Sequence, residues 1–138
     1  MTRLAFLSPH EADVASPPLG KLEIRGGTPD GAIPIGPNRS LLVVDGDVRP
    51  VRNRLLEQGY RVYDMTAALA VFEVEGEPLM QRFTELDLNA LPAIGAVARG
   101  TRAIVERLSN DSFRIFVPQE LARYVSDVLD HARERVNA

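Results

Sequence analysis

Residues 109–118 read Ser-Asn-Asp-Ser-Phe-Arg-Ile-Phe-Val-Pro, and the expected architecture follows from this stretch. Its first three residues are turn formers. Phe113, Ile115 and Val117 then alternate with other residues, which is typical of a strand with one buried face. Pro118 ends the strand and suits the first turn of a helix. The stretch therefore predicts a hairpin strand that leads directly into a helix.

The segment after Pro118 carries the clearest helical pattern of the chain. Its apolar residues recur every three or four positions and form one stripe: Leu121, Tyr124, Val125, Val128, Leu129, Ala132 and Val136. Such a stripe packs against a sheet. Upstream, residues 94–98 and 102–108 are expected to be strands, with Gly95 and Gly100 as bends.

Residues 41–86 predict the order strand, helix, strand, strand, helix. The run 41–44 is continuously apolar, as in a buried strand. Asp47 is a suitable cap for the following helix, which Gly59 ends. Residues 61–64 and 70–74 then read as strands, and apolar residues at helical spacing follow Gly76.

Proline and glycine interrupt almost every apolar run in residues 1–40. Only residues 21–25 alternate cleanly there, as an edge strand would. We therefore expect a Pro/Gly-rich arm with one short strand over residues 1–40 and a single α+β domain over residues 41–138. The expected domain is an antiparallel sheet with helices on one face, close to a ferredoxin-like βαββαβ unit.

Composition excludes several classes of function. The net charge of −3 argues against nucleic acid and anionic membrane surfaces as partners. The chain has no cysteine, which excludes disulfides, zinc–thiolate sites, iron–sulfur clusters and a cysteine nucleophile. Its start lacks the apolar region of a signal peptide, and no apolar run approaches the ~20 residues that span a bilayer. These features predict a cytoplasmic, soluble protein.

No motif predicts catalysis, cofactor binding or a metal site. The two histidines, His10 and His131, lack a second ligand at metal-binding spacing, and we expect His131 to pair with Asp127 at the surface. The sequence contains no phosphate-binding glycine loop and no G-x-S-x-G motif. We therefore expect no catalytic, cofactor-binding or metal-ligating residue in this chain.

Four arginines of the terminal hairpin are candidates to contact an anion or a partner subunit: Arg99, Arg102, Arg107 and Arg114. Guanidinium groups bind carboxylates and phosphates bidentately. Arginines on a strand also serve as a solvated face, so both interpretations stay open.

Several short motifs, in this order, resemble the gamma subunit of heterotetrameric sarcosine oxidase. They are a Gly-Pro before a strand (35–44), a strand ending in Asp-x-[ST] (62–66), a strand leading into a Gly-led helix (70–79), an Asp-Leu…Leu-Pro link (86–92), and a closing hairpin and helix (98–129). The family is part of the wider aminomethyltransferase-like, folate-binding fold. The chain is shorter than a typical gamma subunit before Gly36.

The resemblance implies a non-catalytic subunit that contributes to assembly of a flavin-dependent sarcosine or N-methyl amine oxidase or dehydrogenase. FAD, FMN, NAD and tetrahydrofolate are then expected in larger flavoprotein partner subunits rather than in this chain. Folate-dependent relatives carry an aspartate near the stretch 99–103, where this chain has no carboxylate. That difference disfavours a catalytic role.

Two alternatives remain: a stand-alone folate- or one-carbon-binding protein, and a small ferredoxin-like regulatory module. Fold resemblance does not separate them from an accessory subunit, because function depends on sites rather than on scaffolds. The sequence also leaves open whether the isolated chain self-associates through its arm.

Overall fold

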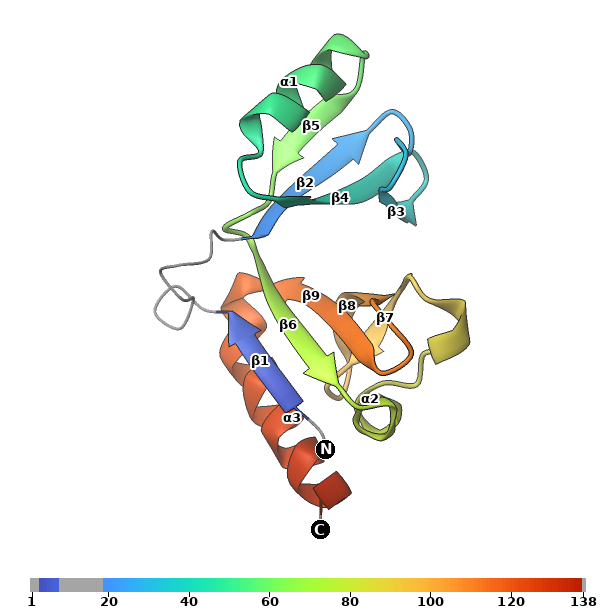
Figure 1. Cartoon of the computed structure of the whole chain (residues 1–138), viewed down its shortest axis with the longest axis vertical. Coiled ribbons are helices and arrows are strands. Elements are labelled where there is room, and N and C mark those ends of the chain that lie inside the picture. Colours follow the sequence, from blue (N-terminus) through green and yellow to red (C-terminus); the bar gives the residue numbers. More distant parts are fainter. Residues whose placement is uncertain (1–2, 8–18, 138) are drawn as a thin grey trace. The chain divides into compact units, whose positions relative to one another are not determined.

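The computed structural model of the chain describes residues 3–7 and 19–137 (Figure 1). The chain divides into two compact units. The first unit holds β1 (Arg3–Leu7) and the chain from Ala70 onward. The second unit includes the described residues from Leu19 to Leu69.

A five-stranded sheet forms the first unit, with the strand order β1-β6-β9-β8-β7. Its strands after β1 are β6 (Leu69–Glu75), β7 (Ala93–Val97), β8 (Thr101–Arg107) and β9 (Ser112–Pro118). β1 pairs antiparallel with β6, and β8 pairs antiparallel with both β7 and β9. Figure 1 shows β6 and β9 running in opposite directions, and the Gly76 N–H after β6 donates to Asp111 O before β9 (2.8 Å).

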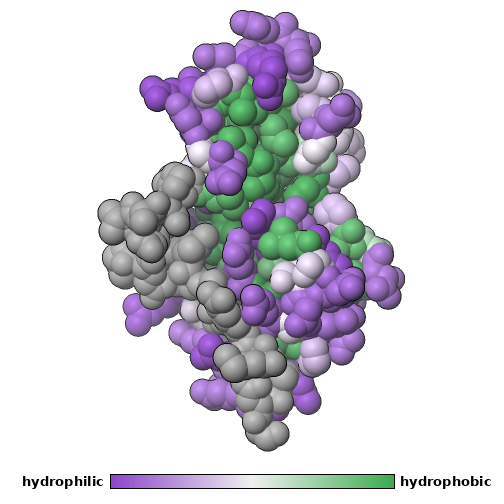
Figure 2. All heavy atoms as spheres, in the orientation of Figure 1, coloured by the Kyte–Doolittle hydropathy of each residue, from purple (hydrophilic) through white to green (hydrophobic). Residues whose placement is uncertain are grey.

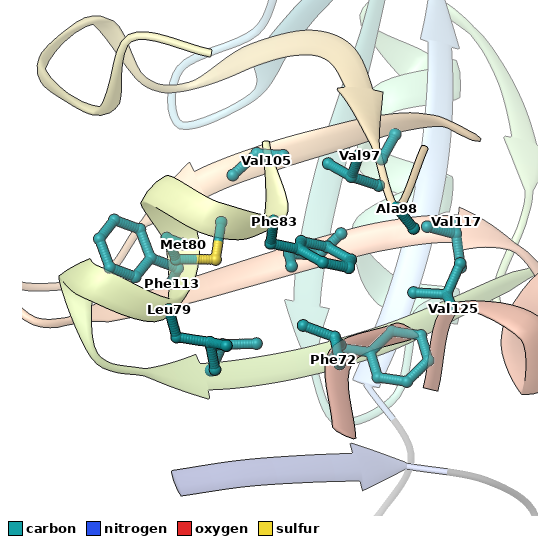
Figure 3. Close-up of a cluster of buried hydrophobic side chains, with 14 of the residues drawn as sticks. Phe72, Leu79, Met80, Phe83, Val97, Ala98, Val105, Phe113, Val117 and Val125 are labelled. Carbon is teal, nitrogen blue, oxygen red and sulfur yellow. The ribbon is translucent and has the colours of Figure 1, made fainter. Parts of the chain in front are cut away.

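Two α-helices, α2 (Glu77–Phe83) and α3 (Ala122–Asn137), pack on one face of this sheet. Short 3-10 turns at Leu88–Ala90 and Gln119–Leu121 precede β7 and α3. Alternate residues of β6, β8 and β9 join both helices in a single buried cluster, part of which Figure 3 shows. The Phe83 ring of α2 lies in the middle of that cluster (Figure 3).

The second unit is a four-stranded antiparallel sheet with one helix. Its strands are β2 (Leu19–Arg25), β3 (Ile33–Gly36), β4 (Arg39–Asp45) and β5 (Arg61–Asp64), in the order β3-β4-β2-β5. The helix is α1 (Arg49–Glu57), which buries Leu55 against Leu22, Ile24 and Val44.

α1 is only nine residues long, so it leaves part of its hydrophobic cluster half-buried. The half-buried members are Leu42, Val48, Val51, Tyr60 and Val62. Figure 2 shows hydrophobic residues gathered over the β2–β4 part of this unit, whereas hydrophilic residues dominate the face of the first unit in that view. The second unit therefore has a hydrophobic cluster that is only partly buried.

The α+β class, with antiparallel strands and helices packed on one face, is confirmed. The expected order over residues 41–86 is also confirmed, because β4, α1, β5, β6 and α2 follow one another. The structure differs in having two sheets, since β6 joins β9 while β4 and β5 pair with β2. Strand periodicity reports which residues are buried but not which sheet a strand enters.

The N-terminal tract also differs from the expected arm with one strand. β2 and β3 are part of the second sheet, and β2 lies inside it between β4 and β5, so the expectation of an edge strand is wrong. The division between the units falls at Leu69 and Ala70 rather than at residue 40. His10 lies outside the described residues.

Candidate functional site

A cavity of about 360 Å³ lies in the first unit between the C-terminal end of α2, the β7–β8 turn and the C-terminal half of α3. We refer to it as the α2–α3 cavity. Its lining is Arg82, Phe83, Ala98, Arg99, Val128, His131, Ala132 and Arg135. The lining includes three arginines and a histidine but no carboxylate.

Hydrogen bonds join the end of α2 to the end of β7 and thereby place Arg82 near Arg99. The Ala98 N–H donates to Phe83 O (3.1 Å). The Thr84 hydroxyl donates to Ala96 O (2.7 Å), and the Thr84 backbone forms an isolated antiparallel β-bridge with Val97. Since Phe83 and Ala98 are both buried in the core, this side of the cavity has a rigid base.

The β7–β8 turn that carries Arg99 has an uncommon backbone. Ala98 and Arg99 have φ values of 46° and 66°, and Gly100 follows with 112°. Left-handed conformations are uncommon for residues other than glycine. The Gly100 N–H closes the turn on Val97 O (3.0 Å), and the Tyr124 hydroxyl of α3 donates to Ala98 O (3.2 Å). The turn is therefore held from both the strand and the helix.

The third side of the cavity is one face of α3. Val128, His131, Ala132 and Arg135 are spaced i, i+3, i+4 and i+7, which places them along one side of a helix. Val128 and Ala132 are half-buried against the core, whereas His131 and Arg135 are exposed. The face thus combines an apolar base with a cationic rim.

None of the three cavity arginines forms an ion pair or a side-chain hydrogen bond with the described residues, whereas other arginines do. Arg82 and Arg135 each lie in the last turn of a helix, where a cation interacts favourably with the helix dipole. The dipole does not account for Arg99, which lies on a turn. The expected pair of Asp127 with His131 is wrong, because His131 forms no ion pair within the described chain and lines the cavity instead.

The structure does not bring the four sequence-predicted arginines together. Arg99 lines the cavity, and Arg102 is exposed on β8 outside the lining. Arg107 donates to the carbonyl oxygens of Leu88 (2.9 Å) and Asn110 (2.7 Å), and its guanidinium stacks on a core phenylalanine. Their role toward an anion or a partner stays a prediction.

Arg114 is the fourth predicted arginine, and two carboxylates already neutralise its charge. Its guanidinium bridges Glu73 (3.2 Å) and Glu106 (3.0 Å) across three neighbouring strands. Its Nε is buried without a hydrogen-bond partner. This network fits a structural role, since the charged pair lies on the sheet with little exposure of the arginine (18%).

Sequence reasoning did not select Arg82, His131 or Arg135 as site residues. The spacing of His131 and Arg135 already places them on one helix face. Their convergence with Arg82 and Arg99 depends on how α2, α3 and the β7–β8 turn pack, which no local pattern encodes.

A second candidate is the amine of Lys21 in the second unit, which is buried (6% exposed). Burial lowers the pKa of Lys21, and the Asp64 carboxylate partly offsets this. The Nζ donates to Thr66 O (2.8 Å) and Leu69 O (2.6 Å). An amine engaged in this way holds the segment after β5 against β2.

Within residues 3–7 and 19–137, no three histidine, aspartate or glutamate side chains are grouped so that they could hold a metal ion. Of the helices in the same part of the chain, none combines the length and apolarity needed to cross a membrane.

No protein-family model matches the chain, and no curated protein matches it in sequence. Among solved structures, it is similar to a chain of the heterotetrameric sarcosine oxidase from Corynebacterium sp. U-96 in complex with pyrrole 2-carboxylate. The TM-score is 0.75 and the sequence identity 13%, and the match covers 99% of this chain and 86% of that chain. At this identity the likeness shows the fold: the chain has the α+β fold of a sarcosine oxidase subunit.

Proposed function

We propose that this chain is a non-catalytic, gamma-like subunit of a multi-subunit flavin-dependent oxidase or dehydrogenase of sarcosine or another N-methyl amine. The supporting observation is the likeness to a chain of a heterotetrameric oxidase over nearly all of this chain. Because the match also covers 86% of that chain, the two are of similar length, as expected for two small subunits.

The character of the described residues supports an accessory role. The buried amine of Lys21 is engaged by two carbonyl oxygens, and the charge of Arg114 is neutralised by two glutamates. Both groups thus serve the fold. The half-buried hydrophobic residues Leu42, Val51 and Val62 of the second unit offer apolar surface that a partner would cover, and stable interfaces bury ~800 Å² on each side.

In this proposal the cofactors belong to the larger subunits. FAD, FMN, NAD and tetrahydrofolate would be bound by those flavoproteins, and this chain would stabilise their assembly. The proposed complex is cytoplasmic.

The test is affinity purification of the tagged full-length chain from its source organism. We expect larger polypeptides to co-elute in fixed stoichiometry, with flavin absorbance that is bleached on addition of sarcosine or a related N-methyl amine. The chain purified alone should bind no flavin and should turn over no amine.

Two results would contradict the proposal. One is amine or tetrahydrofolate turnover by the isolated chain, which would make it an enzyme. The other is elution of the tagged chain without any flavoprotein while it binds tetrahydrofolate in equilibrium dialysis, which would favour the folate-binding alternative.

A further inference from the structure

The geometry points to a binding site for a small phosphate monoester in the α2–α3 cavity, held by Arg82, Arg99 and Arg135. This site is independent of the proposed accessory role. It rests on the charge, the rigidity and the size of the cavity.

The charge of the cavity is unbalanced. Three guanidinium groups and one imidazole line it, no carboxylate does, and the three arginines form no ion pair within the described chain. Elsewhere in the same unit, Arg107, Arg114 and Arg133 have carboxylate partners, whereas the exposed Arg102 and Arg123 have none within the described chain but do not line this cavity. Since the whole chain carries a net charge of −3, this local excess of cations is not a consequence of a basic composition. An anion would relieve the mutual repulsion of the arginines.

The chain holds the three arginines on supports that are already ordered. Arg82 and Arg99 flank the hydrogen bond between Ala98 N and Phe83 O. Arg135 extends the face of α3 that begins with Val128. Binding of a ligand would therefore order the arginine side chains but no backbone. The entropic cost of binding is then lower than at a site whose backbone must also become ordered.

The size and the lining favour a phosphate ester. The volume of about 360 Å³ lies at the lower end of the roughly 300–1,000 Å³ of ligand pockets. Guanidinium forks match phosphate oxygens bidentately, and three arginines suit the three terminal oxygens of a monoester better than the two of a carboxylate. Val128 and Ala132 provide an apolar surface for the group esterified to the phosphate.

The helix dipoles oppose this ligand. The C-terminal ends of α2 and α3, which carry partial negative charge, both lie near the cavity. The affinity must therefore come from the arginine side chains, and each of them should contribute measurably.

Isothermal titration calorimetry of the full chain with phenyl phosphate and with inorganic phosphate tests the site. We expect saturable binding of both, tighter for phenyl phosphate. Arg135→Gln should weaken it by about tenfold or more, since a charge-assisted contact is lost. Arg82→Gln is the second variant, should the first disturb α3. Arg123→Gln removes the same charge from an exposed position of the same helix outside the lining, and it should leave the affinity within about twofold.

Three outcomes would overturn the proposal. They are the absence of saturable binding of either phosphate compound, an equal loss of binding in Arg123→Gln, and capture of a flavoprotein partner that is lost in Arg135→Gln while neither phosphate compound binds. The last result would assign the cavity to an acidic side chain of the partner and would leave the proposed accessory function intact.

Discussion

In the second unit, the carboxylate of Glu23 neutralises two arginines that face each other across neighbouring strands. Arg25 on β2 and Arg39 on β4 lie directly opposite each other, and like charges in that position destabilise a sheet. The Glu23 carboxylate accepts from Arg25 Nε (2.9 Å) and Arg39 Nη2 (2.8 Å). Arg25 also stacks on the Tyr63 ring at 4.9 Å. Glu23 therefore acts as the shared counter-ion of this cross-strand pair.

The stabilisation of the fold by Glu23 should depend on pH. Burial raises the pKa of Glu23, but hydrogen bonds and charges from Arg39 and Arg25 together outweigh it and hold the pKa below that of an ordinary glutamate. The unfolded state then binds more protons than the folded state in acid. The stabilisation by Glu23 is complete above the unfolded pKa and is lost as pH falls through the folded pKa. In Glu23→Gln, the free energy of unfolding should therefore fall less steeply as the pH is lowered into the acid range.

At about pH 7 we expect Glu23→Gln to cost about 1–2 kcal/mol, because two partly exposed arginines lose their counter-ion. Urea unfolding followed by the amide resonances of β2 measures this at several pH values. Glu57→Gln is the matched control, since Glu57 is exposed on α1 and forms no ion pair within the described chain. Equal acid slopes in Glu23→Gln and the unmodified chain would contradict the prediction.

At the scale of an element, α3 shows how far periodicity predicts burial. Val125 and Leu129 are fully buried, as the stripe predicts, and Val128 and Ala132 pack partly against the cluster. Leu121 and Tyr124 belong to the same stripe but are 37% and 45% exposed. Leu121 falls in the 3-10 turn before α3, where the helical spacing does not apply. Tyr124 directs its hydroxyl to Ala98 O instead.

A matched pair of substitutions tests this difference. Leu129→Ala should destabilise the first unit by about 2–5 kcal/mol, because it leaves a cavity between α3 and the sheet. Leu121→Ala removes the same atoms from a partly exposed position and should cost less than about 1 kcal/mol. Thermal unfolding monitored by circular dichroism compares the two. Similar losses for both variants would show that α3 is not packed as described.

At the scale of the whole molecule, two units with unequal cores share one chain. The first core joins residues from four strands and from the helices α2 and α3, whereas the second joins Leu22, Ile24, Val44 and Leu55. Buried apolar contacts set the free energy of local opening. The second unit should therefore open more readily than the first.

Native-state hydrogen exchange measures this inequality. We expect the amides of β8 and β9 to be the most protected and those of β2 and β4 to exchange through an opening of lower free energy. Glu23→Gln should speed exchange in β2 and β4 without changing β8 and β9. Uniform protection across both units, or a change that spreads to β8, would show that the chain opens as one cooperative body.

From residue 41 onward, local sequence was enough to predict the main strands and helices and their order, whereas β1 and β3 were not expected. The turn formers before Phe113 and the alternation after them correspond to β9, and the order from β4 to α2 is as expected. Asp47 was expected to cap α1, but Val48 occupies the cap position and its side chain makes no capping hydrogen bond, whereas the Asp47 carboxylate accepts the Arg49 N–H from one residue further upstream (3.0 Å). These features depend on contacts between residues that are close in sequence, so a short stretch of sequence is enough to predict them.

Tertiary contacts were needed to assign each strand to its sheet and to assemble the cationic cavity. β1 pairs with β6 some seventy residues away, and β2 pairs on one side with β4 and on the other with β5. Arg82, Arg99 and Arg135 meet only because α2, a turn and α3 pack together. Alternation and helical spacing tell which face of an element is buried, whereas the partner of that face depends on the packing free energy of the folded chain.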